Sequence, residues 1–384
     1  MDERLPLPLQ RTIARVMRRG ALRVCGIGNA LLDIVVQPHA DDVLPQSLEW
    51  GAARHLDSRT LDGLRQEFPG GRLHAGGGAA NTLAALAVFG AGCRLIGAVG
   101  QDSAGDTYRA DLEHQGVSCA LQTVPGTTGR CLVLLPPRQG GAAGAAAETA
   151  SAGPAIAAAP AAAAKLDPHY VKHQLAQRAA APAPDVLFIE GFLLPRSAVI
   201  ETALAAVRTA GAMAAGYLPE TGATLIALSL GSAGLAAEYR ETLRQKLLPA
   251  VDLLFSNEAE FRALFDLPSR LPLMASQQNL PAGRVPPTVV TRGRGGATLL
   301  WDGGAIHSEG VTLDESAATA TLDSVGAGDV FAGAFIAALF AGLRIEAALR
   351  FANRAAASSL LAGGGRIPSE QRERLREELR GVCW

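Results

Sequence analysis

The stretch DSVGAGDVFAGAF, residues 323–335, joins a glycine-rich turn to an apolar run that continues to Leu339. The small and apolar residues after the turn have the spacing of a buried helix, and Gly326, Ala327 and Gly328 leave the backbone bare where that helix begins. Backbone N–H groups at a helix N-terminus point at one spot and carry the positive end of the helix dipole. The turn is therefore suited to bind a phosphate group.

A single carboxylate, that of Asp329, belongs to this turn. It is placed to accept a proton from a hydroxyl group brought to the same spot, as a general base does when the hydroxyl attacks phosphorus. The alternative is a glycine turn in which Asp329 only caps the helix. The choice between the two depends on motifs elsewhere in the chain.

Three motifs in order resemble those of the PfkB, or ribokinase-like, family of carbohydrate and nucleoside kinases. The turn is similar to the family's Asp-Thr-x-Gly-Ala-Gly-Asp, with Ser324 in place of Thr; GGGAAN at 76–81 is similar to Gly-Gly-x-x-x-Asn, and NEAE at 257–260 to Asn-x-x-Glu. Three ordered matches are stronger than one short motif. The resemblance covers roughly residues 21–368 and implies an ATP-dependent kinase with Asp329 as its base, assisted by Gly326, Ala327 and Gly328.

From Leu22 onward, short apolar runs alternate with helical stretches. Runs such as VLFI at 186–189 are apolar on both faces, which is typical of a parallel sheet covered by helices on both sides. The alternation predicts a doubly wound α/β domain, and the resemblance refines it to a ribokinase-like three-layer α/β/α fold with a mostly parallel sheet and a small β lid. The strands expected are 22–27, 95–99, 186–189, 225–229, 253–255, 288–291 and 298–301. The helices expected are 79–89, 105–115, 196–209, 236–247, 259–265, 329–341, 345–361 and 369–379.

We expect an N-terminal extension at 1–20 and one kinase domain at 21–384. Segments at about 34–75 and 118–135 break the alternation, and in the family these regions form the lid, which excludes water so that ATP is not hydrolysed. Residues 139–164 are dominated by Gly, Ala and Pro, which predicts a disordered or weakly helical insertion. The family's Arg-Thr pair near this point has only Glu148-Thr149 as a counterpart, so an arginine contact to substrate or phosphate is in doubt.

The octet GIGNALLD at 26–33 is similar to the start of adenosine kinases, in which the residues matching Asn29 and Asp33 bind the ribose hydroxyls. A carboxylate that accepts from two vicinal hydroxyls is a sound sugar clamp; the alternative is that Asp33 caps a turn. Leu31 occupies the third glycine position of a dinucleotide fingerprint, which disfavours a Rossmann dehydrogenase.

The glycine motif supplies the other acceptor-site candidates. Gly77 and Gly78 would let the backbone lie against the sugar, and Asn81 would add an amide hydrogen bond. Loop glycines without a ligand are the alternative. Ribokinases place a lysine where this chain has Gly78, which favours the adenosine-kinase-like branch.

For the nucleotide, VVTRGRGGA at 289–297 is similar to the family's Val-Thr-x-Gly-x-x-Gly-Ala and implies phosphate contacts from Thr291, Gly293 and Gly296. Asn353 matches a position that lines the family's adenine pocket, with buried polar pairing as the alternative.

The same resemblance implies ATP and Mg²⁺ as cofactors, with Asn257 near ATP and Glu260 holding the metal, most simply through water. A monovalent cation beside Asp323 stays open.

Composition bounds the setting. The chain has 384 residues, 48% hydrophobic and 18% charged, with net charge −1, so it can bury a large core and shows no preference for nucleic acid. None of its three lysines follows a glycine as a Walker A lysine must, and no apolar run has the length of a membrane span. Five scattered cysteines without a Cys-x-x-Cys pair suit a reduced compartment. We expect a cytoplasmic protein, monomeric or homodimeric, with organelle import left open.

The sequence thus predicts transfer of the γ-phosphoryl group of ATP to a primary hydroxyl of a nucleoside, adenosine before others. Two alternatives remain: a kinase for another sugar such as ribose or fructose, and a non-catalytic binding protein that kept the kinase fold.

Overall fold

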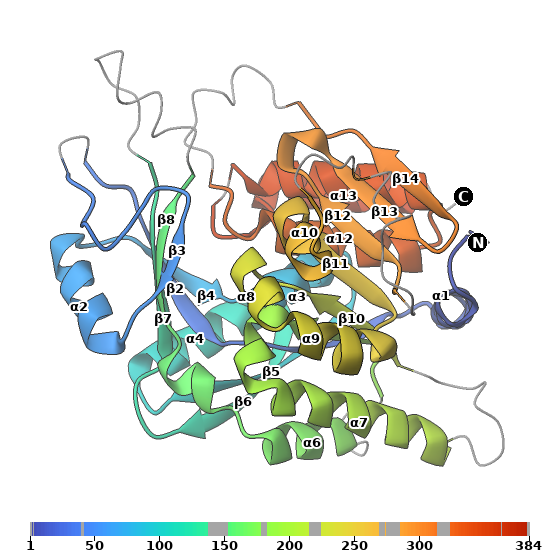
Figure 1. The fold of residues 1–384 in the computed structure, drawn as a ribbon, viewed down its shortest axis with the longest axis horizontal. Helices are drawn as coiled ribbons and strands as arrows, with labels where there is room; N and C mark the ends of the chain where they lie inside the picture. The colour runs from blue at the N-terminus through green and yellow to red at the C-terminus, as the bar shows by residue number, and fades with distance from the viewer. Residues whose placement is uncertain are drawn as a thin grey trace.

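The computed structural model describes residues 2, 4–39, 42–136, 153–177, 183–214, 224–268, 273, 285–312, 323–361 and 363–381. Within these ranges the chain forms one large sheet of nine strands and a smaller sheet of five, joined side by side (Figure 1). The large sheet has the order β14-β13-β12-β11-β10-β9-β1-β5-β6. Its neighbours are parallel from β6 to β12, whereas β13 is antiparallel to both of its neighbours. Its strands are β1 Arg23–Ile27, β5 Gly92–Gly100, β6 Val117–Val124, β9 Val186–Glu190, β10 Leu225–Ser229, β11 Leu253–Asn257, β12 Thr288–Thr291, β13 Ala297–Trp301 and β14 Gly304–Ser308.

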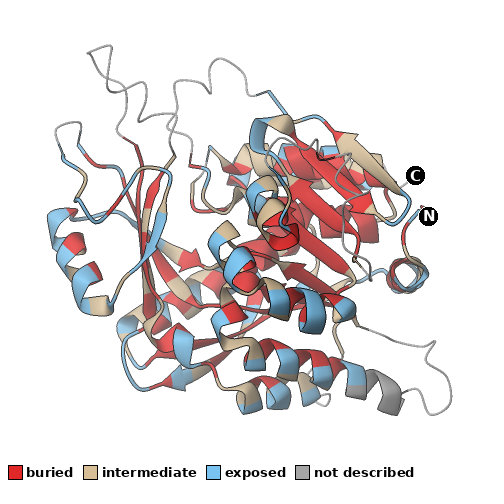
Figure 2. Cartoon of the chain, viewed as in Figure 1, coloured by how far each residue is buried: buried red, intermediate tan, exposed pale blue. Residues whose placement is uncertain are grey.

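Helices cover both faces of the large sheet because its strands are apolar on both sides. In β9, Val186 and Phe188 pack with one set of helices, while Leu187 and Ile189 pack with the other. The first set is α1 Leu7–Arg19, α3 Gly78–Val88, α4 Ser103–His114, α12 Ala327–Phe340, α13 Ile345–Ser359 and α14 Ser369–Gly381. The second is α6 Pro168–Ala176, α7 Ser197–Ala214, α8 Ala233–Glu238 and α10 Glu258–Phe265. This three-layer α/β/α arrangement confirms the predicted fold class, and Figure 2 shows the buried strands between the two helical layers.

The strand order reverses at β1. After β1 the chain adds β5 and β6 on one side, and then returns to add β9 and the later strands on the other side. In open α/β sheets, ligands bind at the carboxyl ends of the strands where the order reverses. The carboxyl ends of β1 and β9 therefore mark where a site is expected.

The smaller sheet, with the order β3-β8-β7-β2-β4, is the lid. Its strands are β2 Leu31–Val36, β3 Ala53–His55, β4 Arg72–Gly76, β7 Gly129–Leu134 and β8 Ala155–Ala159, and α2 Ser58–Glu67 packs on it through Leu61 and Leu64. Because β2 follows β1 closely and β4 leads directly into α3, the base of the lid lies at the carboxyl edge of the large sheet, as Figure 1 shows.

Two expected boundaries differ from the structure. The segment expected in the lid at 118–135 is divided: β6 extends the large sheet beside β5, and only β7 joins the lid. The segment expected as a disordered or weakly helical insertion at 139–164 contains β8, which pairs with β7 and β3, and most of a 3-10 helix at Ala161–Lys165. Residues 139–152, including Glu148-Thr149, lie outside the described ranges.

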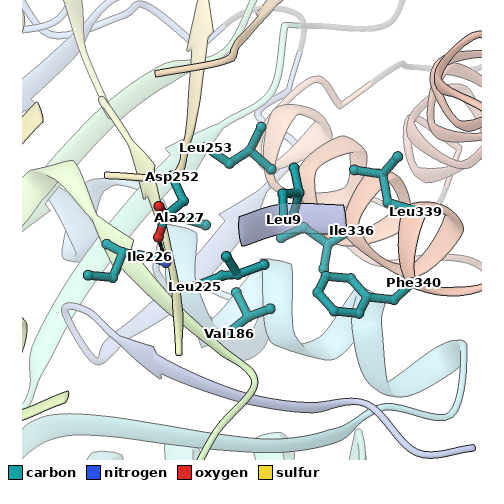
Figure 3. Close-up of a pocket in the computed structure, with 10 residues that line it drawn as sticks. All are labelled: Leu9, Val186, Leu225, Ile226, Ala227, Asp252, Leu253, Ile336, Leu339 and Phe340. Carbon is teal, nitrogen blue, oxygen red and sulfur yellow. Dashed lines mark hydrogen bonds between the residues drawn. The ribbon is translucent and has the colours of Figure 1, made fainter. Parts of the chain in front are cut away.

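The N-terminal segment is packed rather than frayed. Leu9, Ile13 and Val16 of α1 join the core, and Arg15 and Arg19 pair with the buried carboxylate of Asp185. Beside Leu9 is a cavity of about 10 Å³, lined by the first residues of β9, β10 and β11 and by the C-terminal half of α12 (Figure 3). It has room for roughly one water molecule and lies at the amino ends of the strands, away from the expected site. Among the described helices, none combines the length and apolar character needed to cross a membrane.

Candidate active site

Glu190, the last residue of β9, joins the segments that meet where the strand order reverses. Its carboxylate accepts from the backbone N–H of Asn29 at 3.3 Å, from the Asn29 side-chain amide at 3.1 Å and from the backbone N–H of Ala79 at 3.0 Å. Asn29 follows β1, and Ala79 lies in the first turn of α3. One buried carboxylate thus fixes β1, β9 and the start of α3 relative to one another.

The glycine motif is required by close packing. Gly77 has φ +95°, in the left-handed region, and a Cβ there would collide with the carbonyl oxygen of Asn29. At Gly78 a Cβ would lie 3.1 Å from Oδ1 of Asp329. The motif therefore lets the start of α3 approach both the segment after β1 and the start of α12.

Asp329 occupies the third residue of α12, after Gly326 with φ +74°. Its Oδ2 accepts from Nδ2 of Asn81 on α3 at 3.2 Å. No hydrogen bond from the first turn of α12 to the Asp329 carboxylate occurs in the described part of the chain, so the capping alternative is not what holds this side chain. The two residues predicted from separate motifs, 248 positions apart, thus contact each other.

The start of α12 presents backbone N–H groups beside Asp329. The N–H of Ala327 donates to the carbonyl oxygen of Ser324 at 3.3 Å. For the N–H groups of Gly326 and Gly328, the described ranges contain no acceptor within hydrogen-bonding distance. These two groups remain available for an anion, whereas Ala327 would have to give up a long bond.

Burial raises the pKa of Asp329 to about 7; the hydrogen bond from Asn81 opposes the rise, and repulsion by Glu190 and Glu260 adds to it. The pKa of Glu190 is also raised by burial, against its three hydrogen bonds. A carboxylate with a pKa near the working pH is suited to general base catalysis.

Asp33 lies in the middle of β2, between His74 and Cys131 on the neighbouring strands, and is 4% exposed. Turn capping is therefore wrong for Asp33. Its carboxylate lies 4.0 Å from Nε2 of His74 and receives no hydrogen bond from the described residues. Burial raises its pKa to about 8, with Arg366 opposing the rise.

The Asn29 side chain is fully engaged by the protein. Besides donating to Glu190, its Nδ2 lies 3.3 Å from the carbonyl oxygen of Phe192, and its Oδ1 accepts from Arg196 at 2.5 Å. The Phe192 ring meets the ring of His55 edge-on at 6.5 Å, so the lid and the body touch next to Asn29.

The residues expected at the nucleotide bond mainly to their own surroundings. Asn257 and Glu260 form a reciprocal cap of α10: Oδ1 of Asn257 accepts from the N–H of Glu260 at 2.8 Å, and Oε2 of Glu260 accepts from the N–H of Asn257 at 2.9 Å. Thr291 Oγ1 donates to the carbonyl oxygen of Ser256 at 3.4 Å.

Asn353 lies on α13 and donates to the carbonyl oxygens of Ser308 at 3.3 Å and Glu309 at 2.9 Å. Gly296, with φ +77°, packs against the same Ser308 carbonyl oxygen. Gly293 also has a positive φ, +54°, in the turn that precedes β13. These bonds match the buried-pairing alternative for Asn353 and bring it close to Gly296.

A magnesium ion has partial support from the residues present. Among the described residues there is no cluster of three His, Cys, Asp or Glu side chains that would hold a metal alone. Mg²⁺ usually keeps several waters and binds one or two carboxylates plus phosphates. Glu260 uses one site on each oxygen for the cap and retains others, which fits contact through water. Asp323 accepts from the N–H groups of Val325 at 2.9 Å and Gly364 at 2.7 Å, and so ties the turn before α12 to the segment after α13.

Of three charged residues at the site, sequence reasoning placed one, Glu190, at the carboxyl edge of the sheet, because it follows a strand that is apolar on both faces, but assigned it no role. The other two were missed. Arg196 and Arg366 carried no signal, because the partners that bring them to the site are 167 and 285 positions away.

Comparison with known proteins agrees with this geometry. A family model described as pfkB family carbohydrate kinase matches residues 51–372. A 2-dehydro-3-deoxygalactonokinase of Haloferax volcanii is 37% identical over 115 residues, 29% of this chain; the chain spans about a third (33%) of that relative's length.

Solved structures are similar over nearly the whole chain. Adenosine kinase from Sinorhizobium meliloti has a TM-score of 0.73 at 20% identity, covering 94% of this chain and 99% of its own. A probable sugar kinase from Rhizobium etli has a TM-score of 0.73 at 20% identity, covering 94% and 98%. Adenosine kinase from Anopheles gambiae, in complex with P1,P4-di(adenosine-5) tetraphosphate, has a TM-score of 0.70 at 22% identity, covering 89% and 96%. At these identities the likeness concerns the fold.

Proposed function

The chain belongs to the pfkB family of carbohydrate kinases, and from that premise we propose that it transfers the γ-phosphoryl group of ATP to a primary hydroxyl of a nucleoside, adenosine first, or of a sugar. The observation that carries the proposal is the pairing of Asp329 with Asn81 beside the start of α12. The same turn holds a carboxylate with a pKa of about 7 and two backbone N–H groups that have no backbone acceptor in the described ranges.

The residues divide the chemical work as follows. Asp329 accepts the proton of the acceptor hydroxyl as the hydroxyl oxygen attacks the γ-phosphorus of ATP; the bond from that phosphorus to the bridging oxygen breaks, and ADP leaves. The N–H groups of Gly326 and Gly328 donate to the oxygens of the transferring group, and Ala327 joins them when its bond to Ser324 yields. Each such donor contributes about 3 kcal/mol to transition-state stabilisation. Asn81 keeps the carboxylate in place throughout.

Asp33 is the proposed clamp for acceptor hydroxyls. Its carboxylate is buried and receives no hydrogen bond from the described residues, so it has accepting capacity for two hydroxyl donors. Asn29, whose own amide is engaged by Glu190 and Arg196, would act by holding this edge of the site and would contact the substrate only after exchanging a bond. Gly77 and Gly78 would let the substrate approach the backbone.

For the donor, Asn257, Thr291, Gly293, Gly296 and Asn353 are the proposed ATP contacts, and Glu260 the proposed support of Mg²⁺ through water. When bound, the metal would supply positive charge to the phosphate oxygens. The closure of the lid over the acceptor, in contact with the body at His55 and Phe192, would exclude water from the reaction.

A nucleoside is favoured over a simple sugar by Phe192, whose carbonyl oxygen lies 3.3 Å from Nδ2 of Asn29 and whose ring contacts His55 of the lid. Aromatic side chains stack on bases, a contact worth about 1–3 kcal/mol. A sugar acid is the second candidate, because the Haloferax volcanii kinase shares higher identity, though over a short stretch, than the adenosine kinases do.

The test is ATP consumption by the purified chain with Mg²⁺ and a panel of adenosine, other nucleosides, ribose, fructose and 2-dehydro-3-deoxygalactonate. Phosphorylation of adenosine that is lost in Asp329→Asn supports the proposal in full. If only a sugar or a sugar acid is phosphorylated, the proposed mechanism still holds and the substrate class changes from nucleoside to that compound. Phe192→Leu separates the two, since it should raise the KM of a nucleoside and not that of a sugar. Bound ATP with no turnover of any acceptor would contradict the proposal and favour a non-catalytic binding protein.

A further inference from the structure

Arg366 reaches the candidate active site from the C-terminal part of the chain. It follows the glycines at 363–365, and Gly365 packs against both Gly326 and Asn81. Its Nη1 donates to Oδ1 of Asn81, and its Nη2 donates to the carbonyl oxygen of Ala75 at the end of β4. One guanidinium therefore joins the segment before α14 to β4 and to α3.

The bond from Arg366 determines which way the Asn81 amide faces. A guanidinium only donates, so it must meet the amide oxygen, and the amide nitrogen is then turned toward Asp329 at 3.2 Å. If the Asn81 amide were reversed, its oxygen would face the Asp329 carboxylate, and its NH2 group would face the guanidinium of Arg366, donor against donor. Arg366 thus permits a single orientation.

Arg366 is also the cation in a cluster of acids. Asp329 is faced by Glu190 from the end of β9 and by Glu260 from α10, and it is coupled to Asp33 on β2. Arg366 opposes the repulsion at both Asp329 and Asp33, and is itself faced by Asp111 and Tyr108 of α4.

The position of Arg366 lowers the stability of the fold, because one of its donors is buried without a partner in the described ranges. Nε of Arg366 is buried and has no hydrogen-bond partner among the described residues. An unpaired buried donor destabilises a protein by about 1–3 kcal/mol. Such a cost is retained most readily where the side chain has a role in the site.

We propose that Arg366 is a positioning residue for Asp329: by fixing the amide of Asn81, it aims that amide's N–H at the carboxylate and holds the carboxylate beside the start of α12. The inference rests on the proposed kinase function and concerns the same site. Arg366 itself touches neither the acceptor hydroxyl nor the transferring group in this role.

The first experiment compares Arg366→Met with the full-length wild type. We expect kcat to fall about 10- to 100-fold, as for a small misplacement of a catalytic group, while the KM of ATP changes less than about twofold. Loss of the Arg366 charge and loss of the oriented Asn81 N–H both favour protonated Asp329. The acidic limb of the profile of kcat against pH should therefore shift to higher pH by about one unit. Arg366→Lys keeps the positive charge but lacks the two-pronged guanidinium. It should return the acidic limb to its wild-type position and restore only part of kcat.

Arg372→Met is the matched control. Arg372 lies six residues further on and donates to the carbonyl oxygen of Ile367 at 3.0 Å and to Gln115 at 2.9 Å, away from Asn81. It should lower the melting temperature and leave the pH profile in place.

A double-mutant cycle with Asn81→Ala tests the route. If Arg366 acts through Asn81, Arg366→Met should have little further effect on kcat in the Asn81→Ala background. Additive effects of the two substitutions on kcat would overturn the positioning role, and so would an Arg366→Met variant whose pH profile keeps its acidic limb in place. In both cases an active wild type would still support the kinase function. A wild type that phosphorylates no acceptor would overturn the proposed function and the role together.

Discussion

The two sides of the site differ in how their polar residues are satisfied. The acceptor side consists of Asp33, Asn81, Asp329 and Arg366, and its contacts join β2 to β4, and α3 to α12 and to the C-terminal segment. The nucleotide side consists of Asn257, Glu260, Thr291 and Asn353, whose bonds stay within a cap or reach adjacent backbone. On the acceptor side, the Asp33 carboxylate receives no hydrogen bond from the described residues. On the nucleotide side, each of the four residues already has a protein partner, and Glu260 keeps spare acceptor sites.

This difference predicts different consequences of mutation. Groups that the fold leaves with free acceptors and raised pKa are the ones a substrate can satisfy. Groups already bonded to backbone contribute to stability first and to binding second. Substitutions on the acceptor side should therefore reduce turnover, and substitutions on the nucleotide side should reduce stability as well as affinity for ATP.

The largest effect is expected for Asp329→Asn. Removing the proposed base should lower kcat about 100- to 10,000-fold with the fold retained, as circular dichroism and steady-state kinetics would show. Asp57→Asn is the control, because it makes the same chemical change at the cap of α2, where asparagine caps equally well. A folded Asp329→Asn with near wild-type kcat would remove Asp329 from the mechanism.

The next effect is expected at the clamp. Above about pH 8, where Asp33 is ionised, Asp33→Asn should raise the KM of the acceptor about 10- to 100-fold through the loss of a charge-assisted hydrogen bond of about 1.5–3 kcal/mol, with the KM of ATP unchanged. Initial rates at varied acceptor and saturating ATP would measure this. An equal rise in both KM values would mean that the two sides are not separate.

A smaller effect, of a different kind, is expected at the α10 cap. Asn257→Ala should lower stability by about 1 kcal/mol, or roughly 1 °C in melting temperature for a chain of 384 residues, and weaken ATP binding without changing the acceptor KM. Asn257→Asp, which still caps, is the control for stability. If Asn257→Ala melts like the wild type, the cap does not stabilise the fold and the comparison between the two sides is lost.

The smallest effect concerns stability against pH. The pKa of Asp329 is about 7 in the folded chain against an ordinary value of 3.8, so its ionised form destabilises the fold, increasingly as the pH rises from 3.8 to 7 and fully above 7. Asp329→Asn should therefore raise the melting temperature near pH 8, and raise it by less near pH 5. If thermal unfolding shows the same increase in melting temperature at both pH values, the increase does not come from ionisation of Asp329.

Much of the fold was predictable because local pattern and tertiary position agree. The run VLFI became β9 between two helical layers, and the small-residue run after Gly326 became the buried α12. β8 was not predictable: AIAAA has high helix propensity, and it forms a strand because β7 and β3 pair with it. The helix expected at 236–247 is interrupted at Tyr239, a break that the composition does not signal.

At the site, motifs predicted which residues meet but not what each one bonds to. Asn81 and Asp329 were named separately and lie in contact. The other partners of the site residues were not predictable. Glu190 and Arg196 bond to Asn29, and Arg366 bonds to Asn81. Each pair is more than 150 positions apart, and a single sequence carries no pattern for such contacts.

The account depends most on Asp329 acting as a base within an acidic cluster, and the pH profile of kcat/KM for the preferred acceptor tests it most directly. Measured at saturating ATP from about pH 5 to about pH 9, kcat/KM should fall toward low pH as two carboxylates take up protons, Asp329 with a pKa of about 7 and the acceptor clamp Asp33 with a pKa of about 8. In Asp33→Asn, the profile should keep a single ionisation of unit slope with an apparent pKa near 7, because Asp329 must be ionised to accept the proton. A profile that stays flat down to pH 5 would contradict the account.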